Sequence, residues 1–186
     1  MGAVLISMLF LLQGCVAVAA GGAVAGASAA VDRRTTGTLV EDESIELKAV
    51  RAMLADQDLN AQAHLNVTSY NTIVLLTGET PTDELRRRAE QIVRGIDKVS
   101  TVHNEIIVAA PSSMITRSSD TVITSKVKTK LLADKNIEGV NIKVVTENGV
   151  VYLMGLVSRA EAELTTEVAR QTGGVQKVVK IFQYTD

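Results

Sequence analysis

A single side chain in this sequence has a nucleophilic thiol, Cys15, and its neighbours indicate what that thiol could do. Residues 1–14 hold no charged side chain, and the run Val4–Leu12 is apolar enough to be the hydrophobic core of a signal peptide. Gly14 places a small residue directly before the cysteine, and all 40 Lys, Arg, Asp and Glu residues lie beyond Val31. The sequence therefore predicts a targeting segment that ends next to Cys15, and a thiol placed for attachment to a membrane.

Two other interpretations of Cys15 remain open. The apolar stretch continues to Val31 and contains Gly22-x-x-x-Gly26, a small-xxx-small pattern found where membrane helices pair, so a membrane-spanning helix is one alternative. A buried structural cysteine is the other. Residues 16–31 are rich in Gly and Ala and only weakly apolar, which favours a flexible spacer over a membrane span.

A second group of residues suits binding rather than catalysis. Lysines cluster at 126, 128 and 130, and a helical wheel at 100° per residue separates an expected core side (Ile123, Val127 and Leu131) from an exposed side. Lysines beside an exposed apolar residue suit an anionic bilayer, where each basic residue contributes about 1 kcal/mol. The residues predicted to bind phospholipid are Val122, Lys126, Lys128, Thr129, Lys130 and Ala133. A helix face that is merely solvated is the alternative.

The distribution of charge supports this face over a rival one. Residues 32–110 contain 9 basic and 13 acidic side chains, whereas residues 111–186 contain 10 basic and 8 acidic ones. A basic triplet, Arg86–Arg88, stands in the acidic half, but Asp83, Glu84 and Glu90 surround it at spacings that form helical ion pairs. The net charge of −2 excludes a strongly basic nucleic-acid binder.

The remaining polar residues do not predict an enzyme. His64 and His103 are the only histidines, and neither stands at a metal-ligand spacing such as His-x-x-x-His. We expect both to be ordinary strand residues, with His64 at the surface. No Gly-rich phosphate loop and no Gly-x-Ser-x-Gly elbow is present. We therefore expect no catalytic residues, no metal and no cofactor.

The elements that must position these residues occur twice, in the same order. In the first copy we expect a helix from Ser44, strands at 63–69 and 72–78, a helix from a cap at Thr80 to Arg94, and a strand at 99–108. In the second we expect a helix capped by Ser119 or Asp120 that runs to Ala133. Strands at 142–146 and 150–154 follow around an Asn148-Gly149 type I′ turn, then a helix with a Ser158/Glu161 capping box and a strand at 175–184. Each copy has about 65 residues and buries limited apolar surface alone, so we expect the two to pack together.

Matching anchors establish the repeat and lead to a family. Leu54-Ala55-Asp56 corresponds to Leu132-Ala133-Asp134, and each second strand closes on Leu-x-Gly, at Leu76–Gly78 and Leu153–Gly155. In the second copy Gly174-Val175-x-x-Val178 follows the second helix. This pattern resembles the BON domain. The resemblance implies an α+β chain of two tandem αββαβ domains, each a three-stranded sheet packed on two helices.

The N-terminal segment resembles a second known pattern. Leu12-Gln13-Gly14-Cys15 is similar to the lipobox of bacterial lipoproteins, which implies cleavage before Cys15 and acylation of Cys15, while Val16 in place of Asp implies delivery to the outer membrane. Two BON domains behind a lipobox resemble the dual BON-domain outer-membrane lipoproteins. The expected organisation is a signal peptide at 1–14, lipidated Cys15 and flexible linker at 15–43, first domain at 44–110, linker at 111–119 and second domain at 120–186.

The resemblance also implies a function. It implies a periplasm-facing protein that binds anionic phospholipid, with phosphatidylglycerol or cardiolipin as the expected lipid, and supports outer-membrane integrity. The alternative is a periplasmic scaffold that binds another envelope protein.

Overall fold

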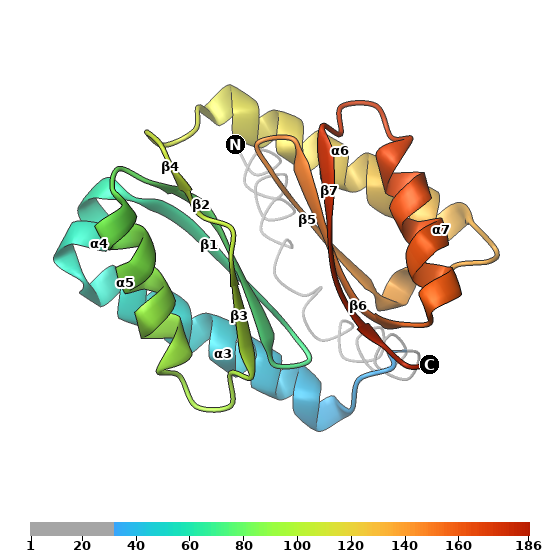
Figure 1. Ribbon diagram of the computed structural model, residues 1–186, viewed down its shortest axis with the longest axis horizontal. Helices are drawn as coiled ribbons and strands as arrows, with labels where there is room; N and C mark the ends of the chain where they lie inside the picture. Colours follow the sequence, from blue (N-terminus) through green and yellow to red (C-terminus); the bar gives the residue numbers. More distant parts are fainter. Residues whose placement is uncertain (1–31) are drawn as a thin grey trace, which may run out of the picture. The chain divides into compact units, whose positions relative to one another are not determined.

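The computed structural model describes residues 32–186, and the predictions for Cys15 and the signal peptide lie outside these residues. The α+β fold of two αββαβ repeats is confirmed (Figure 1). The first repeat consists of α3 (Thr36–Ala55), α4 (Gln57–Gln62), β1 (His64–Tyr70), β2 (Ile73–Thr80), α5 (Asp83–Arg94), β3 (Thr101–Asn104) and β4 (Ile107–Val108). The second consists of α6 (Met114–Ala133), the 3₁₀ turn η2 (Gly139–Asn141), β5 (Ile142–Glu147), β6 (Val150–Val157), α7 (Arg159–Arg170) and β7 (Lys177–Tyr184).

The two sheets have the same topology. In each, a hairpin pairs the first two strands in antiparallel fashion, and the strand that follows α5 or α7 joins the middle strand in parallel. Asn148 and Gly149 both have positive φ, as a type I′ turn requires, so the predicted Asn-Gly hairpin is confirmed. Asn71 and Thr72 adopt the same positive φ in the first hairpin, where the sequence has no glycine.

The third strand of the first sheet is interrupted. Residues 99–108 were expected to form one strand, but β3 and β4 pair separately with β2, and Glu105 and Ile106 lie between them. The Asn104 side chain accepts a hydrogen bond from the backbone N–H of Ile106 at 3.2 Å. This local bond competes with the regular ladder and separates the strand into two parts.

Both first helices begin earlier than expected. Thr35 caps α3 by accepting from the Thr38 N–H, and Ser113 caps α6 by accepting from the Thr116 N–H, both at 3.1 Å. Residues 36–43 and 114–119 are therefore helical, and the predicted starts at Ser44 and at Ser119 or Asp120 are wrong. Sequence periodicity missed these turns because they have few buried apolar residues to mark them.

The N-cap predictions for α5 and α7 had different outcomes. Ser158 caps α7 as predicted, whereas Thr82, not Thr80, caps α5. Thr80 instead pairs with Val108 as the last residue of β2.

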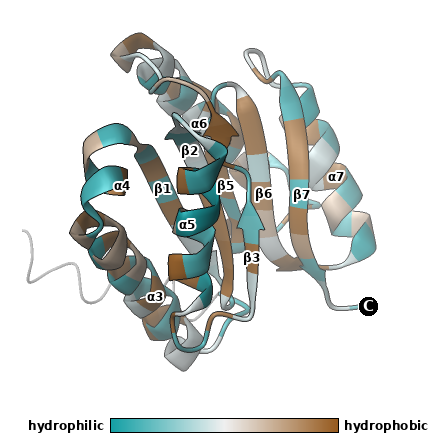
Figure 2. Ribbon diagram, turned by 60° about the vertical axis from the view of Figure 1, so that its left-hand side comes forward, coloured by the Kyte–Doolittle hydropathy of each residue, from teal (hydrophilic) through white to brown (hydrophobic). Residues whose placement is uncertain are grey.

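Alternation along the middle strands builds three apolar clusters. Val74 and Leu76 of β2 face the first domain's helices, and Val151 and Leu153 of β6 face those of the second. Leu75 points to the opposite side, as the period of two in a strand requires. The third cluster consists of Tyr70, Leu75, Tyr152, Met154 and Ile181. It joins both sheets, so the expected packing of the two copies is confirmed. In Figure 2, β1, β6 and β7 carry long brown (hydrophobic) stretches, whereas β3 and the visible side of α5 are mostly teal (hydrophilic).

Tyr152 provides a pH test of this third cluster. Burial, together with the carboxylates of Glu105 and Glu147, raises the pKa of Tyr152 to about 12. Since a tyrosine in an unfolded chain ionises near pH 10, the folded state retains a proton between pH 10 and 12 that the unfolded state releases. The Tyr152 contribution to the free energy of unfolding is therefore complete below pH 10 and falls by about 3 kcal/mol as the pH rises to 12. Urea unfolding of the wild type and Tyr152→Phe should show a difference that changes across this window, and a constant difference would contradict the assignment.

Within residues 32–186, no helix combines the length and the apolar character that crossing a bilayer requires.

Candidate functional site

Helix α6 presents the predicted lipid-binding residues to solvent. Ile123, Val127 and Leu131 are buried in the core, as the helical wheel predicted. The six predicted residues are all exposed, and Val122, a large apolar side chain, is 52% exposed. Among residues 32–186, this face is exposed to solvent.

Two residues at the start of α6 extend this face and were missed from the sequence. Met114 and Ile115 are 71% and 80% exposed, the highest values among the large apolar side chains of residues 32–186. Together with Val122, Lys126 and the Gly173-Gly174 loop they line a groove of about 540 Å³. The signal was Ser113, an N-cap residue directly before Met114-Ile115, but the expected later helix start placed both residues in a linker.

The lysines of α6 do not all belong to one face. Lys126 lines the groove with Met114 and also a second hollow, of about 450 Å³, with Val122, Thr129 and Lys130. Lys130 also donates to the backbone carbonyl of Gln171 at 3.2 Å. Lys128 instead lines a separate cavity with residues of the first domain, so the structure separates it from the other two. Ala133 is exposed but lines neither hollow.

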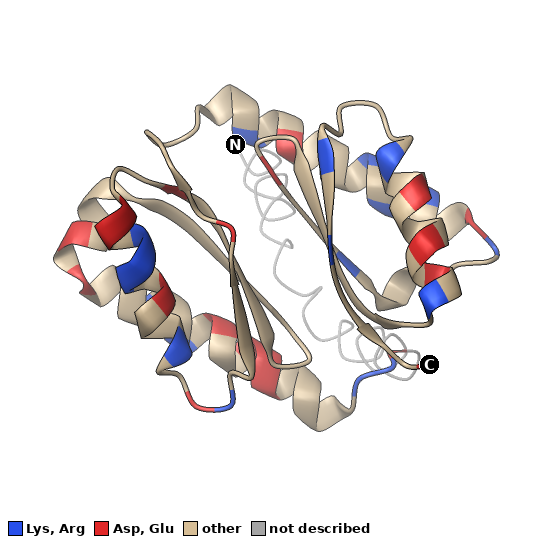
Figure 3. Ribbon diagram, viewed as in Figure 1, with Lys and Arg blue, Asp and Glu red and all other residues tan. Residues whose placement is uncertain are grey.

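The charge on this face is uncompensated. Among residues 32–186, neither Lys126 nor Lys130 forms an ion pair with a carboxylate. Figure 3 shows basic residues (blue) on the later turns of α6 and acidic residues (red) on α3. An anion in solution therefore meets unpaired positive charge on the second domain.

The rival basic triplet is largely neutralised. Arg86 and Arg87 pair with Asp83 at 2.5 and 2.6 Å, and Arg88 pairs with Glu84 at 2.8 Å. These pairs have the i,i+3 and i,i+4 spacings expected from the sequence. The triplet therefore offers much less free charge than the face of α6.

A buried carboxylate at the same place in each repeat fixes the first helix to the hairpin turn. Asp120 of α6 accepts from the backbone N–H groups of Asn148 and Gly149 at 2.9 and 2.8 Å. Asp42 of α3 accepts from both N–H groups of the turn at residues 71–72, each at 2.8 Å. Asp120 therefore fixes α6 against its own sheet and sets which residues face outward.

The segment before α3 holds the two domains together. The Arg33 guanidinium, directly before the first repeat, pairs with Glu161 at 2.6 Å and with Glu138 at 3.1 Å, both in the second repeat. The backbone N–H of Arg33 also donates to the side-chain oxygen of Asn141. The backbone carbonyl of Asn141 in turn accepts a hydrogen bond from the Tyr70 hydroxyl at 2.9 Å. The hydrogen bond that Arg33 donates to Glu161, opposed by burial, raises the pKa of Arg33, consistent with a structural ion pair.

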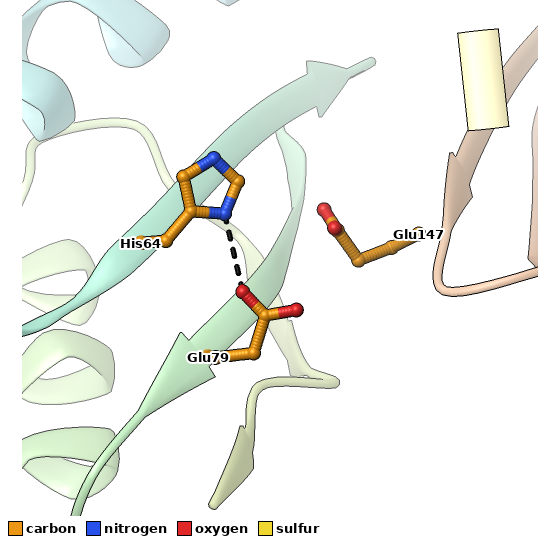
Figure 4. A group of neighbouring side chains, drawn as sticks. All are labelled: His64, Glu79 and Glu147. Carbon is orange, nitrogen blue, oxygen red and sulfur yellow. Dashed lines mark hydrogen bonds and ion pairs between the residues drawn. The ribbon is translucent and has the colours of Figure 1, made fainter. Parts of the chain in front are cut away.

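His64 is not the surface residue that the sequence predicted. Its side chain is 24% exposed, and its Nδ1 lies 3.2 Å from the Glu79 carboxylate (Figure 4). Glu147 of the second domain lies beside this pair. The sequence could not show this group, because its three members are separated by 15 and 68 residues and meet only when the domains pack.

The fold defines a class: a tandem pair of αββαβ domains with opposite charge balance. A family model of the BON domain matches residues 41–110 and 119–186, and the chain belongs to this family. The chain is 37% identical over 184 residues to the outer membrane lipoprotein DolP of Haemophilus influenzae. The match covers 99% of this chain and 95% of that protein.

Two further relatives share most of the chain. The 21 kDa hemolysin of Actinobacillus pleuropneumoniae is 38% identical over 154 residues, with 83% of this chain and 79% of that protein covered. The osmotically-inducible protein Y of Escherichia coli is 31% identical over 145 residues, with 76% and 72% covered. The predicted family is therefore confirmed.

Proposed function

We propose that this protein is a non-catalytic outer-membrane lipoprotein that faces the periplasm and binds anionic phospholipid through its second BON domain. The similarity to a named outer membrane lipoprotein along nearly the full chain supports the location, with Cys15 as the lipidated residue. The observation that carries the binding function is the exposed face of α6, where Met114, Ile115 and Val122 adjoin Lys126, which has no carboxylate partner among the described residues. This binding supports the integrity of the outer membrane.

The two kinds of residue on this face act at different depths. The ammonium groups of Lys126 and Lys130 bind phosphates in the headgroup layer, where each contributes about 1 kcal/mol. The apolar side chains enter the upper acyl region, where burial stabilises the complex by about 25 cal/mol per Å². Because Val122 is small, it inserts limited area, and we expect modest affinity that depends on both contributions.

A flotation assay tests this function without the anchor. The fragment 32–186 is mixed with vesicles of phosphatidylcholine alone, or of phosphatidylcholine with phosphatidylglycerol or cardiolipin. We expect flotation with the anionic vesicles alone, weakening as salt screens the lysines. Equal flotation with all vesicles, or none with any, would contradict the proposal.

The two apolar residues at the start of α6 allow a separate prediction. Met114→Ser with Ile115→Ser removes apolar surface from the groove without touching a core residue, because both side chains are exposed. We expect unchanged folding and at least about tenfold weaker vesicle binding, since losing two inserted side chains costs about 1.4 kcal/mol or more. The control is Leu164→Ser on α7, also exposed, at 44%, which should bind like the wild type. Flotation across a lipid titration gives both affinities.

One observation favours the second candidate function, a protein scaffold. Helix α3 exposes Val40, Leu47, Val50 and Leu54 at 64%, 50%, 41% and 57%. Their spacing of 7, 3 and 4 residues places them along one side of the helix. A photo-crosslinker at Leu47 in living cells should then capture one envelope protein in stoichiometric yield; without such a product the scaffold role fails.

A further inference from the structure

Three side chains with metal-binding atoms meet where the two domains pack. His64 begins β1 and Glu79 stands near the end of β2, while Glu147 ends β5 of the other domain. One nitrogen of His64 and one oxygen of each carboxylate all lie within 4.8 Å of one another (Figure 4). The group thus converges on one point although its members come from both domains.

The two carboxylates of this group are buried. Glu79 and Glu147 are 1% and 7% exposed, and within residues 32–186 neither pairs with a lysine or an arginine. Neutral groups supply the other contacts. Asn148 donates to Glu79 at 2.6 Å, and the Ser112 backbone also hydrogen-bonds Glu79. Asn66 donates to Glu147 at 2.9 Å, and the Thr77 hydroxyl donates to it at 3.4 Å. Buried carboxylates are normally paired with cations or bound to metals, so two of them beside one imidazole form a site that suits a cation.

The donor set and spacing match a divalent metal site. We propose that His64, Glu79 and Glu147 bind a divalent transition-metal cation, with Zn²⁺ as the ion best suited to one imidazole nitrogen and two carboxylate oxygens. Bonds of 2.0–2.2 Å in a tetrahedron separate neighbouring ligand atoms by about 3.4 Å. The His64 and Glu79 atoms already stand 3.2 Å apart, so the Glu147 oxygen, which lies within 4.8 Å of both, must move up to about 1.4 Å closer. Three protein ligands leave the fourth position to water.

A route from solvent to this group exists. A cavity of about 350 Å³ is lined by His64 and Glu147 together with hydroxyl-bearing residues of α6 and β5. Arg117 and Lys128 also line it, and their positive charges oppose a cation, whereas Asp120 on the same wall favours one. An ion bound here has ligands in both domains and therefore stabilises their packing, independently of any lipid.

Thermal unfolding in the presence of metal tests the site. The full-length protein in detergent is stripped with a chelator and unfolded with and without Zn²⁺ or Mn²⁺, at 100 times the dissociation constant obtained by calorimetry. We expect a rise in Tm of about 5–10 °C with Zn²⁺ for the wild type, because an ion that binds the folded state stabilises it by mass action. Excess chelator should reverse the rise.

Substitutions decide whether these residues bind the ion. His64→Gln and Glu147→Gln should each remove most of the Zn²⁺-dependent rise, while keeping hydrogen-bonding groups of similar size. The matched control is His103→Gln, which changes the only other histidine and should keep the full rise. An equal rise in the wild type and all three variants would overturn the proposal, as would the absence of any rise or calorimetric heat with both ions. If a variant does not fold, the heat of Zn²⁺ binding to His103→Gln, in which His64 is the only histidine left, is measured before and after chemical modification of histidine and provides the same decision.

Discussion

Gly78→Ala should lower the free energy of unfolding by about 4 kcal/mol, a large fraction of the total. Gly78 has φ +113°, in a region that side chains rarely adopt, and an added Cβ would overlap the carbonyl oxygen of His64 and lie 2.9 Å from its carbonyl carbon. The clash is with backbone across the β1–β2 ladder, so no side chain can move aside to relieve it. Backbone strain and overpacking each cost about 1–3 kcal/mol, and here they add.

The matched control for this substitution is Gly173→Ala. A Cβ at Gly173 meets nothing within 4 Å, so we expect a change within about 0.5 kcal/mol. Urea unfolding followed by circular dichroism measures both variants. A Gly78→Ala protein as stable as the wild type would show that the close approach of the two strands is not a constraint.

Lys126→Glu with Lys130→Glu should lower the affinity for anionic vesicles at least about 30-fold. Each reversal removes an attraction of about 1 kcal/mol and adds a repulsion, and a loss of about 2 kcal/mol already corresponds to this factor. Both side chains are exposed and neither pairs with a carboxylate among the described residues. The double variant loses only the exposed hydrogen bond from Lys130 to the Gln171 carbonyl, so the protein should still fold. Vesicle flotation at two salt concentrations measures the affinity and its electrostatic share.

A charge-matched control separates location from net charge. Arg87→Glu with Arg94→Glu makes the same change in net charge on α5, where the side chains are 72% and 55% exposed. We expect its affinity to stay within about threefold of the wild type, because non-specific repulsion at this distance is screened. If both double variants lose binding equally, overall charge rather than the α6 face attracts the membrane.

Local patterns predicted most of the fold. The Asn148-Gly149 turn and the Ser158 cap depend on neighbouring residues, and the structure confirms both. The repeat could be found because its anchors, such as Gly78 and Gly155, stand where backbones approach closely in both sheets. Helix starts were harder, because Thr35 and Ser113 precede turns with little buried surface.

The site was only partly predictable, for a similar reason. Helical periodicity placed Val122, Lys126 and Lys130 on the exposed side of α6, because that depends on one element. Lys128 differs because its surroundings include the other domain. The same holds for His64 and Glu147, whose contact depends on how two sheets pack, which no spacing along one element encodes.

The face of α6 can be located directly by nuclear magnetic resonance. The ¹⁵N-labelled fragment 32–186 is titrated with phosphatidylglycerol nanodiscs that contain a spin-labelled lipid, and the loss of each amide signal reports its distance from the bilayer. Our account predicts the strongest losses at residues 114–130 of α6, and far weaker losses with uncharged nanodiscs. Strongest losses at Arg86–Arg88 or along the exposed side of α3, or equal losses with both kinds of nanodisc, would contradict it.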